Sequence, residues 1–372
     1  MEPKTSVPVS LGPEGRLLSL DFFRGLTMFL LIGEWTHLYS ILNKPELKGT
    51  IWGFIGTQFH HHPWNGLHFW DLVQPFFMFI VGVAIPLSIA KRLAKGQTWT
   101  AIRRHAFQRA FLLLLFGWAL YCIGPGRITF RFQNVLAQLS FTYLVAFLLA
   151  RRSVYTQLGV SFAFLIVTEI LYRTFPVPGF NQPFVPDHNF GAWVDMLISG
   201  ELSHGHWVSF NAVPTAAHTI WGVLAGLLLM SEKEPKDKIR ILVVAGLIGL
   251  ALGYALNPIT PIIKRIATSS FVIVTGGWCL LALAFSYWLI DVKKISKWSR
   301  FFAIVGMNPL FIYLFAHTGG AEWLHGIVKP FGVGFFSWIS PTFAQIVIGL
   351  TVWGMMWYMT YWLYRRKIFI KL

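Results

Sequence analysis

The segment HHHPWNGLHFWD, residues 60–71, concentrates titratable side chains in a chain that is otherwise strongly apolar. It holds four histidines and the carboxylate of Asp71. Imidazole changes charge near neutral pH, so it serves as a base, a nucleophile or a metal ligand. A histidine that takes up a proton or an acyl group usually has its second nitrogen held by a carboxylate or a carbonyl. Asp71 and Glu34 are the carboxylates expected within reach, although Asp71 could instead be a first-turn acid that favours the helix dipole.

A metal site is the other chemistry that clustered histidines allow. His60, His61 and His62 are consecutive, and in an extended chain alternate side chains point in opposite directions, so they do not converge on one ion. The chain also has no HExxH or CxxC pattern. We therefore expect no bound metal.

The composition is that of a membrane protein. The chain has 372 residues, of which 55% are hydrophobic and 12% charged, and its mean hydropathy is +0.58. Soluble domains carry about 25% charged residues. The net charge of +16 would suit nucleic-acid binding, but most Lys and Arg fall in alternate connections between apolar runs, which the positive-inside rule explains. We therefore expect the lipid bilayer as a partner and no nucleic acid.

Apolar runs long enough to span a bilayer predict an all-α bundle of ten transmembrane helices with both termini cytoplasmic. The region 320–338 is either re-entrant or an eleventh span. We expect a cytoplasmic tail over 1–16, one transmembrane domain over 17–364 with long outer loops at 43–68 and 175–210, and a basic tail over 365–372. The aromatic residues of loop 175–210 could stack on a sugar or lie on the lipid surface. The predicted spans are about 17–42, 69–90, 105–123, 133–150, 154–174, 211–231, 239–256, 267–290, 299–318 and 340–364.

Polar residues inside these runs need a partner or a function, because they are costly in lipid. Asp21 and Arg24 are three residues apart on one helix face, which predicts a structural ion pair, with a phosphate contact by Arg24 as the alternative. Glu34 and His37 share the same spacing near the outer end of the first span. Asn308 precedes Pro309 and should break its helix, which is tolerated where the backbone lines a cavity or is buried. Asn134 and Gln138, four residues apart after Arg131, either face a substrate or join helices.

These residues together resemble one family. RLLSLDFFRGLTMFLLIGE, HHPWNGLHFWDLVQPFFMFIVGVAIPLS, RFQNVLAQLSFTYL, GVLAG and VGMNPLFIYL occur in the order seen in the transmembrane acetyltransferases related to heparan-α-glucosaminide N-acetyltransferase, with a closer likeness to the bacterial NagX-type branch. The resemblance covers residues 16 to 364. Its most specific part is His-x-x-Trp-Asn-Gly, then four intervening residues, then Asp-Leu-x-x-Pro.

The resemblance implies transfer of an acetyl group from acetyl-CoA to the amine of a glucosamine-type sugar. It places the active histidine at His61, with Asp71 and Glu34 beside it as catalytic residues. The resemblance also matches Asn65 and Asn308, for which we expect substrate contacts. From their residue types and positions, and not from the resemblance, we expect further substrate contacts by Trp64, His37, Asn134 and Gln138. Positive charge makes Arg24, Arg103, Arg104 and Arg131 candidates for binding CoA, although membrane topology alone also explains flanking basic residues. One departure is Gln138, where the family often has Arg, so a phosphate contact there is absent or moved.

Two reaction routes stay open, because His61 could act as a general base or could accept the acetyl group first. The rival functions are a sugar or anion transporter, which also uses broken helices, and an O-acetyltransferase of cell-envelope glycans. No inverted repeat is visible, which argues against the transporter. The expected location is a bacterial inner membrane. The acceptor sugar and the oligomeric state, with a homodimer as one alternative, are left open.

Overall fold

The computed structural model describes residues 17–370, so the tail predicted at 1–16 and the last two residues of the basic tail lie outside it. Every regular element in this part of the chain is a helix, which confirms the predicted all-α class. The helices form two compact units, which we describe separately. The first comprises the described residues up to Leu20, Trp64–Gly66 and Gln74–Lys294. The second comprises Asp21–Pro63, Leu67–Val73 and the described residues from Ile295 onward.

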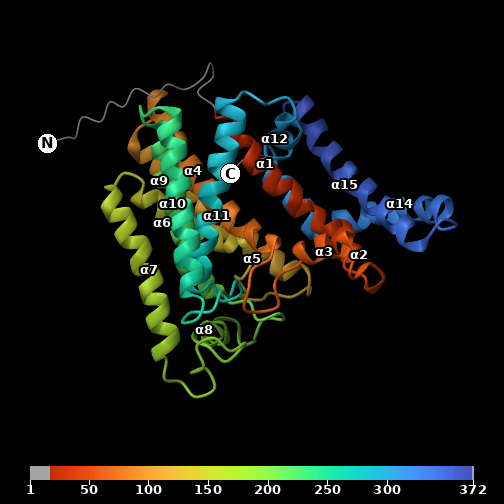
Figure 1. Cartoon of the computed structure of the whole chain (residues 1–372), viewed down its shortest axis with the longest axis horizontal. Helices are drawn as coiled ribbons and strands as arrows, with labels where there is room; N and C mark the ends of the chain where they lie inside the picture. The colour runs from red at the N-terminus through yellow and green to blue at the C-terminus, as the bar shows by residue number, and fades with distance from the viewer. Residues whose placement is uncertain (1–16, 371–372) are drawn as a thin grey trace. The chain divides into compact units, whose positions relative to one another are not determined.

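Seven helices in the described residues are long and apolar enough to cross a membrane, or eight if a bent pair counts as one span (Figure 1). They make the chain a multi-pass membrane protein, and each lies within a few residues of a predicted span. The predicted number of ten is not confirmed. The seven are α4 with its first turn (Phe69–Ala94), α5 (Trp99–Ile123), α7 (Val154–Thr174), α9 with its first turn (Ser209–Met230), α10 (Pro235–Leu256), α11 with its last turn (Ser269–Val292) and α15 (Pro341–Arg365).

The other three predicted spans differ from a single long helix for local reasons. The run 17–42 is interrupted, because α1 (Leu18–Gly33) ends before His37, which has a left-handed backbone (φ 61°), and α2 (Leu38–Leu42) begins after it. The run 133–150 forms α6 (Val135–Leu149), which has only 15 residues. The run 299–318 breaks where Asn308 and Pro309 predict a break, so α12 (Ser299–Val305) and the helical stretch Pro309–Phe336 are bent by 66°.

The first unit is a bundle of α4–α11. Within it α5 packs on α6, both α6 and α7 pack on α9, and α10 packs on α11. The contact of α4 with α9 depends on two glycines, because a Cβ at Gly82 would overlap the carbonyl of Thr219 and one at Gly222 would overlap that of Phe79. Lining the bundle with small residues is how membrane helices approach closely without a hydrophobic driving force.

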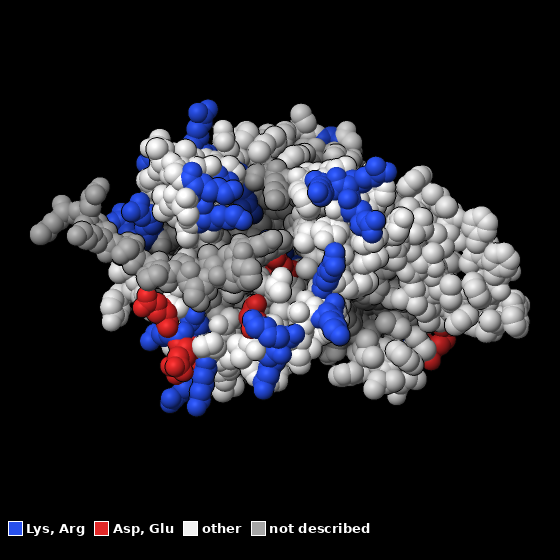
Figure 2. Space-filling model, turned by 90° about the horizontal axis from the view of Figure 1, so that it is seen from above, with Lys and Arg blue, Asp and Glu red and all other residues white. Residues whose placement is uncertain are grey.

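The two ends of this bundle differ in charge. The short connections 95–98, 150–153 and 231–234 share one end, because each joins consecutive helices that run in opposite directions. Basic side chains gather there, and Figure 2 shows Lys and Arg predominating on that face. The opposite end carries the longer connections 124–134, 175–208 and 257–268. This asymmetry within one unit is what the positive-inside rule predicts.

The second unit contains α1, α2, α3 (Ile51–Gln58), α12, α13 (Pro309–Phe315), α14 (Ala321–Phe336) and α15. Its helices α12 and α14 and the short α2 all pack against α15. The indole Nε1 of Trp353 on α15 donates to the carbonyl of Phe29 on α1 at 3.0 Å, and the two rings stack 4.4 Å apart. Tyr39, Trp70 and Val73 form a buried cluster beside this contact, so α15 and the start of α4 share a core with α1 and α2.

Candidate functional site

The histidine loop, residues 59–71, connects α3 to α4, and two of its histidines hold its backbone. Nδ1 of His60 donates to the carbonyl of Gly56 at 2.8 Å, at the C-terminal end of α3. Nδ1 of His68 donates to the carbonyl of His60 at 2.9 Å. The His62 ring lies against the His68 ring with centroids 4.8 Å apart. His60 and His68 therefore hold the backbone of the loop, His62 packs on His68, and His61 pairs with a carboxylate.

His61 and Asp71 form a histidine–carboxylate pair in the second unit. Nδ1 of His61 lies 2.9 Å from Oδ1 of Asp71. The Asp71 side chain is 1% exposed, whereas that of His61 is 30% exposed. The other carboxylate oxygen, Oδ2, accepts the backbone N–H of His62 at 3.1 Å and that of His68 at 2.9 Å. These two donors fix the carboxylate, so it can accept only from the Nδ1–H tautomer of His61.

This arrangement suits acid–base or nucleophilic chemistry. With Nδ1 protonated and held by Asp71, the Nε2 atom of His61 carries the lone pair that takes a proton or an acyl group. The carboxylate also stabilises the imidazolium that forms when a proton is taken. Within residues 17–370, no three His, Cys, Asp or Glu side chains come close enough together to hold a metal ion.

Trp64, Asn65 and Gly66, in the middle of the histidine loop, belong to the first unit and are held by its long connections. Nε1 of Trp64 donates to the carbonyl of Phe184 at 2.7 Å. The side-chain Oδ1 of Asn65 accepts the backbone N–H of Ile262 at 3.0 Å, and the N–H of Gly66 donates to the carbonyl of Ile262 at 2.9 Å. The Trp-Asn-Gly part of the motif is thus an anchoring sequence, with each residue bonded to a connection far along the chain.

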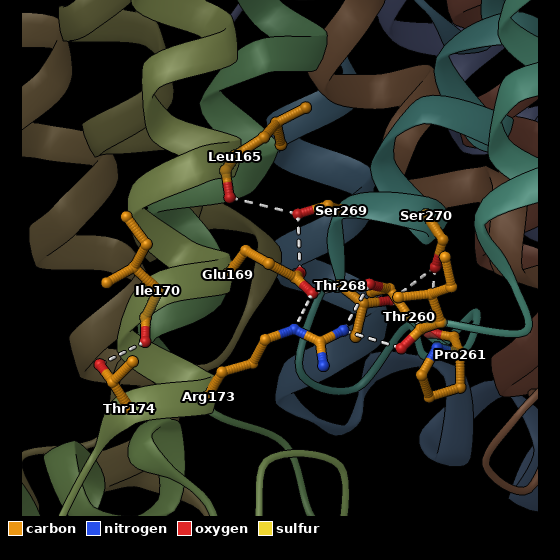
Figure 3. A network of polar contacts seen from close by, with 11 residues as sticks. Leu165, Glu169, Ile170, Arg173, Thr174, Thr260, Pro261, Thr268, Ser269 and Ser270 are labelled. Carbon is orange, nitrogen blue, oxygen red and sulfur yellow. Dashed lines mark hydrogen bonds and ion pairs between the residues drawn. The ribbon is translucent and has the colours of Figure 1, made fainter.

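A charged network at the end of α7 holds the connection 257–268 that binds Asn65 (Figure 3). Oε1 of Glu169 accepts from Nε of Arg173 and from the hydroxyl of Thr260, both at 2.6 Å. Its Oε2 accepts from the hydroxyl of Ser269 at 3.3 Å. Arg173 also donates to the carbonyl of Ile259 at 2.7 Å. Glu169 therefore ties α7 to both ends of the connection, and so stabilises the surface to which Asn65 is paired.

The same end of the first unit contains a buried carboxylate, Asp195 on α8 (Phe190–Ser199). It accepts from the side-chain amide of Gln133 at 3.1 Å and from the backbone N–H of Ser209 at 3.1 and 3.2 Å. Burial raises the pKa of Asp195 above its ordinary value, although these hydrogen bonds and the positive charge of Arg131 act in the opposite direction. Asp195 joins α8 to the segments before α6 and α9.

Four other predicted site residues lie in the second unit. Arg24 donates to Asp21 at 2.8 Å, so the expected ion pair is present. Glu34 begins the short turn Glu34–Thr36 and is exposed. His37 lies 2.8 Å from Glu322 of α14, because the break at its left-handed backbone removes it from the helical face of Glu34. Asn308 is fully buried and binds the backbone of Ile368 and Ile370 at 3.0 and 2.8 Å, so it holds the C-terminal segment.

In the first unit, the side chains of Asn134 and Gln138 join helices, which is one of the two alternatives that the sequence left open for them. Oδ1 of Asn134 caps α6 by accepting the N–H groups of Leu136 and Ala137 at 3.1 and 3.0 Å. Its amide donates to the carbonyl of Gly117 on α5. Gln138 donates to the carbonyl of Gln133 at 2.9 Å and accepts from the amide of Gln74 on α4. Both side chains use their amide groups to connect α4, α5 and α6.

The predicted CoA-binding arginines of the first unit lie at its opposite ends. Arg103 and Arg104 are exposed in the first turns of α5. Arg131 follows α5 and pairs with Glu201 at 3.0 Å. About 20 helical residues separate the two positions, or roughly 30 Å at 1.5 Å per residue. The first unit therefore does not bring Arg131 together with Arg103 and Arg104.

Sequence reasoning did not identify the pairs Glu169–Arg173 and Asp187–His206, nor the buried Asp195. Only Glu169 and Arg173 carry a local signal, the spacing of four residues that joins opposite charges on a helix. Asp187 and His206 lie 19 residues apart within one long connection. The composition of that connection left a sugar-binding role and a lipid-surface role open, and no spacing rule pairs these two residues.

Comparison with known proteins finds two that are similar in sequence to this chain over nearly its whole length. The human heparan-α-glucosaminide N-acetyltransferase is 25% identical in an alignment that covers 96% of this chain and 60% of the human protein. The mouse protein of the same name is 24% identical over the same shares. The chain is related to the heparan-α-glucosaminide N-acetyltransferases. It thus spans about 60% of the length of these relatives, and no family model matches it.

The similarity to the heparan-α-glucosaminide N-acetyltransferases confirms the family-level resemblance inferred from the ordered motifs. The closer likeness to the NagX-type branch stays a prediction. Because the alignment covers 96% of the chain, it extends over residues of both compact units. The likeness is therefore a property of the membrane bundle rather than of one motif.

Proposed function

We propose that the chain is a membrane-bound acetyltransferase that moves the acetyl group of acetyl-CoA to the amine of a glucosamine-type sugar, with His61 as its catalytic base. The observation that carries this proposal is the hydrogen bond between His61 Nδ1 and the buried Asp71 carboxylate, which prepares Nε2 to take a proton. The likeness to glucosaminide N-acetyltransferases supports the donor and the acceptor class.

In the proposed reaction the sugar amine attacks the thioester carbonyl of acetyl-CoA. The new N–C bond forms as the C–S bond breaks, and the products are the N-acetylated sugar and free CoA. The attacking nitrogen must lose one proton, which His61 Nε2 accepts and then passes to the leaving thiolate. Asp71 stabilises the imidazolium between these two proton transfers. The proton balance is closed without another reactant.

The direct test is transfer of labelled acetyl from acetyl-CoA to free glucosamine by the full chain in detergent. We expect His61→Ala to lose transfer by about 10²–10⁴-fold, the usual contribution of a positioned base, while acetyl-CoA binding and the melting temperature persist. His204→Ala is a suitable control, because His204 is exposed in the connection 175–208 and its side chain makes no hydrogen bond within residues 17–370. Full activity of His61→Ala would refute the site assignment.

The same protein distinguishes the base mechanism from an acetyl-histidine intermediate. Incubation with labelled acetyl-CoA in the absence of sugar should leave the protein unlabelled if the amine attacks the thioester directly. Label that remains on a His61-containing peptide after rapid denaturation, and that leaves when glucosamine is added, would establish the two-step route instead.

A further inference from the structure

A second histidine–carboxylate pair lies in the first unit, outside the site described above. Nδ1 of His206 lies 2.6 Å from Oδ2 of Asp187, and both side chains are partly exposed, at 41% and 29%. Both residues belong to the long connection 175–208, whose aromatic and polar composition is unusual for a simple linker. Neither residue takes part in the proton transfers assigned to His61.

The backbone of this pair is held in an uncommon conformation at both residues. Asp187 has φ 61° and His206 has φ 64°, which is the left-handed region that residues other than glycine adopt uncommonly, Asp and His more often than most. Such conformations persist only where the surrounding structure imposes them, and they cluster at ligand-binding and catalytic sites. Arg265 provides part of that support, because its side chain donates to the carbonyl of Gly205 and its carbonyl accepts from the N–H of Val208 at 3.3 Å.

The pair lies against the tryptophan of the family motif. The rings of His206 and Trp64 meet edge to face, with centroids 6.0 Å apart and planes at 89°. Trp64 has its indole N–H committed to the carbonyl of Phe184 at 2.7 Å, so the ring can offer only its apolar surface to a ligand. His206 has Nδ1 committed to Asp187, and its Nε2 has no hydrogen-bond partner within residues 17–370.

We infer that Trp64, His206 and Asp187 form a binding subsite for the acceptor sugar. A pyranose offers an apolar C–H face, which suits an aromatic ring, and hydroxyl groups, which suit a polarised imidazole. Nε2 of His206 accepts a hydrogen bond from a sugar hydroxyl, and Asp187 fixes the tautomer that makes this possible. The identification of the ligand as the acceptor sugar rests on the acetyl transfer proposed above. Trp64 lies three residues after His61 in the chain.

The test uses His206→Asn and Asp187→Asn, because asparagine tolerates a left-handed backbone better than most residues. His204→Asn, two residues before His206 and exposed, is the matched control. Calorimetric titration of the full chain in detergent with glucosamine is combined with initial rates at varied glucosamine and varied acetyl-CoA. We expect His206→Asn to weaken glucosamine binding and raise its KM by about tenfold, the loss typical of one good hydrogen bond. The value of kcat and the KM for acetyl-CoA should stay within about twofold.

The outcomes separate this inference from the proposed function. Binding of glucosamine that depends on His206, in a wild-type protein that transfers no acetyl group, supports the subsite and refutes the proposed reaction. Equal affinity in His206→Asn and His204→Asn refutes the subsite, as does a wild-type protein that binds no glucosamine with or without acetyl-CoA. If His206→Asn lowers the melting temperature and raises KM equally for glucosamine and acetyl-CoA, His206 has a structural role, and this result also refutes the subsite.

Discussion

Replacement of Asp71 by asparagine should invert the tautomer of His61 while leaving the loop folded. Asparagine keeps the size and shape of the side chain, but one of its two oxygen positions becomes an NH2 group. At the Oδ2 position the backbone N–H groups of His62 and His68 point at the side chain from 3.1 and 2.9 Å. An NH2 group placed there would face two donors, so the amide oxygen takes that position and Nδ2 faces His61.

The size of this preference follows from the two donors. A buried donor left without a partner costs about 1–3 kcal/mol, so the wrong amide orientation costs roughly 2–6 kcal/mol. Each 1.4 kcal/mol is a factor of ten in population, so the side chain adopts the correct orientation in nearly all molecules. Nδ2 then donates to Nδ1 of His61, which moves the imidazole proton to Nε2. The nitrogen assigned to proton abstraction is thereby blocked.

We expect kcat for acetyl transfer to fall by about 10²–10⁴-fold in Asp71→Asn, which is the range for a positioned general base. The same change behind the histidine of a serine-protease triad costs about 10⁴-fold. The melting temperature should change little, whereas Asp71→Ala should lower it clearly because both backbone donors lose their acceptor. Labelled acetyl transfer to glucosamine and thermal unfolding in detergent measure the two effects.

Asp237→Asn is the matched control, because Asp237 is an exposed first-turn acid of α10. If Asp71 served only to favour its helix dipole, both asparagine variants would lose about 0.3–1 kcal/mol of stability and keep full activity. A kcat of Asp71→Asn within about threefold of the wild type, at an unchanged melting temperature, would refute the tautomer argument.

Three further substitutions test the first unit. Asp195→Asn should remove one contribution to the pH dependence of stability. Burial raises the pKa of Asp195, so the folded form binds its proton more readily than the unfolded form, and the stability that this proton contributes is present below about pH 4 and is lost as pH rises through the raised pKa. A series of thermal melts with the same slope against pH in the variant and the wild type would contradict the argument. Asn134→Ala should cost about 0.5–2 kcal/mol through loss of the α6 cap yet leave both KM values unchanged, so a raised glucosamine KM at unchanged stability would restore Asn134 to substrate binding. Glu169→Gln should weaken the bonds to Arg173 and Thr260 and increase hydrogen exchange of Ile262, the partner of Asn65; unchanged exchange there would show that the network does not support the motif.

The helices were the most predictable part of the molecule, because each apolar run is a local property of the chain. Seven spans lie close to their predicted limits, and the break before Pro309 follows from the backbone restriction that proline imposes. The predicted span 17–42 was wrong as a continuous helix, since hydropathy carries no information about the left-handed backbone of His37. The helix α6 is apolar throughout, but its 15 residues are too few for it to be counted as a membrane span.

The site was predictable to the extent that its parts are close in sequence. Asp71 lies in the first turn of the helical stretch that follows the histidines, and a carboxylate at that point reaches back to the preceding loop, so a partnership with a histidine could be expected. The roles of His60 and His68 could not be predicted from the sequence, because their partners are backbone carbonyls, which any residue type supplies. Asp187 and His206 pair within a connection that has no repeating geometry, so spacing alone gives no register for them.

The arginines show why residue type and sequence proximity do not select a phosphate site. Arg103, Arg104 and Arg131 carry the same group and flank the same helix, yet α5 places about 30 Å between them. Arg131 is already paired with Glu201, and its charge also acts on the buried Asp195. A CoA phosphate at Arg131 would have to displace Glu201 and leave that carboxylate without its closer cation. At the basic end of the unit, Arg103 and Arg104 are exposed in the first turns of α5, near the connection 95–98, and no carboxylate competes for them in the described residues. A phosphate contact in the first unit therefore costs less at the N-terminal end of α5 than beyond its C-terminal end.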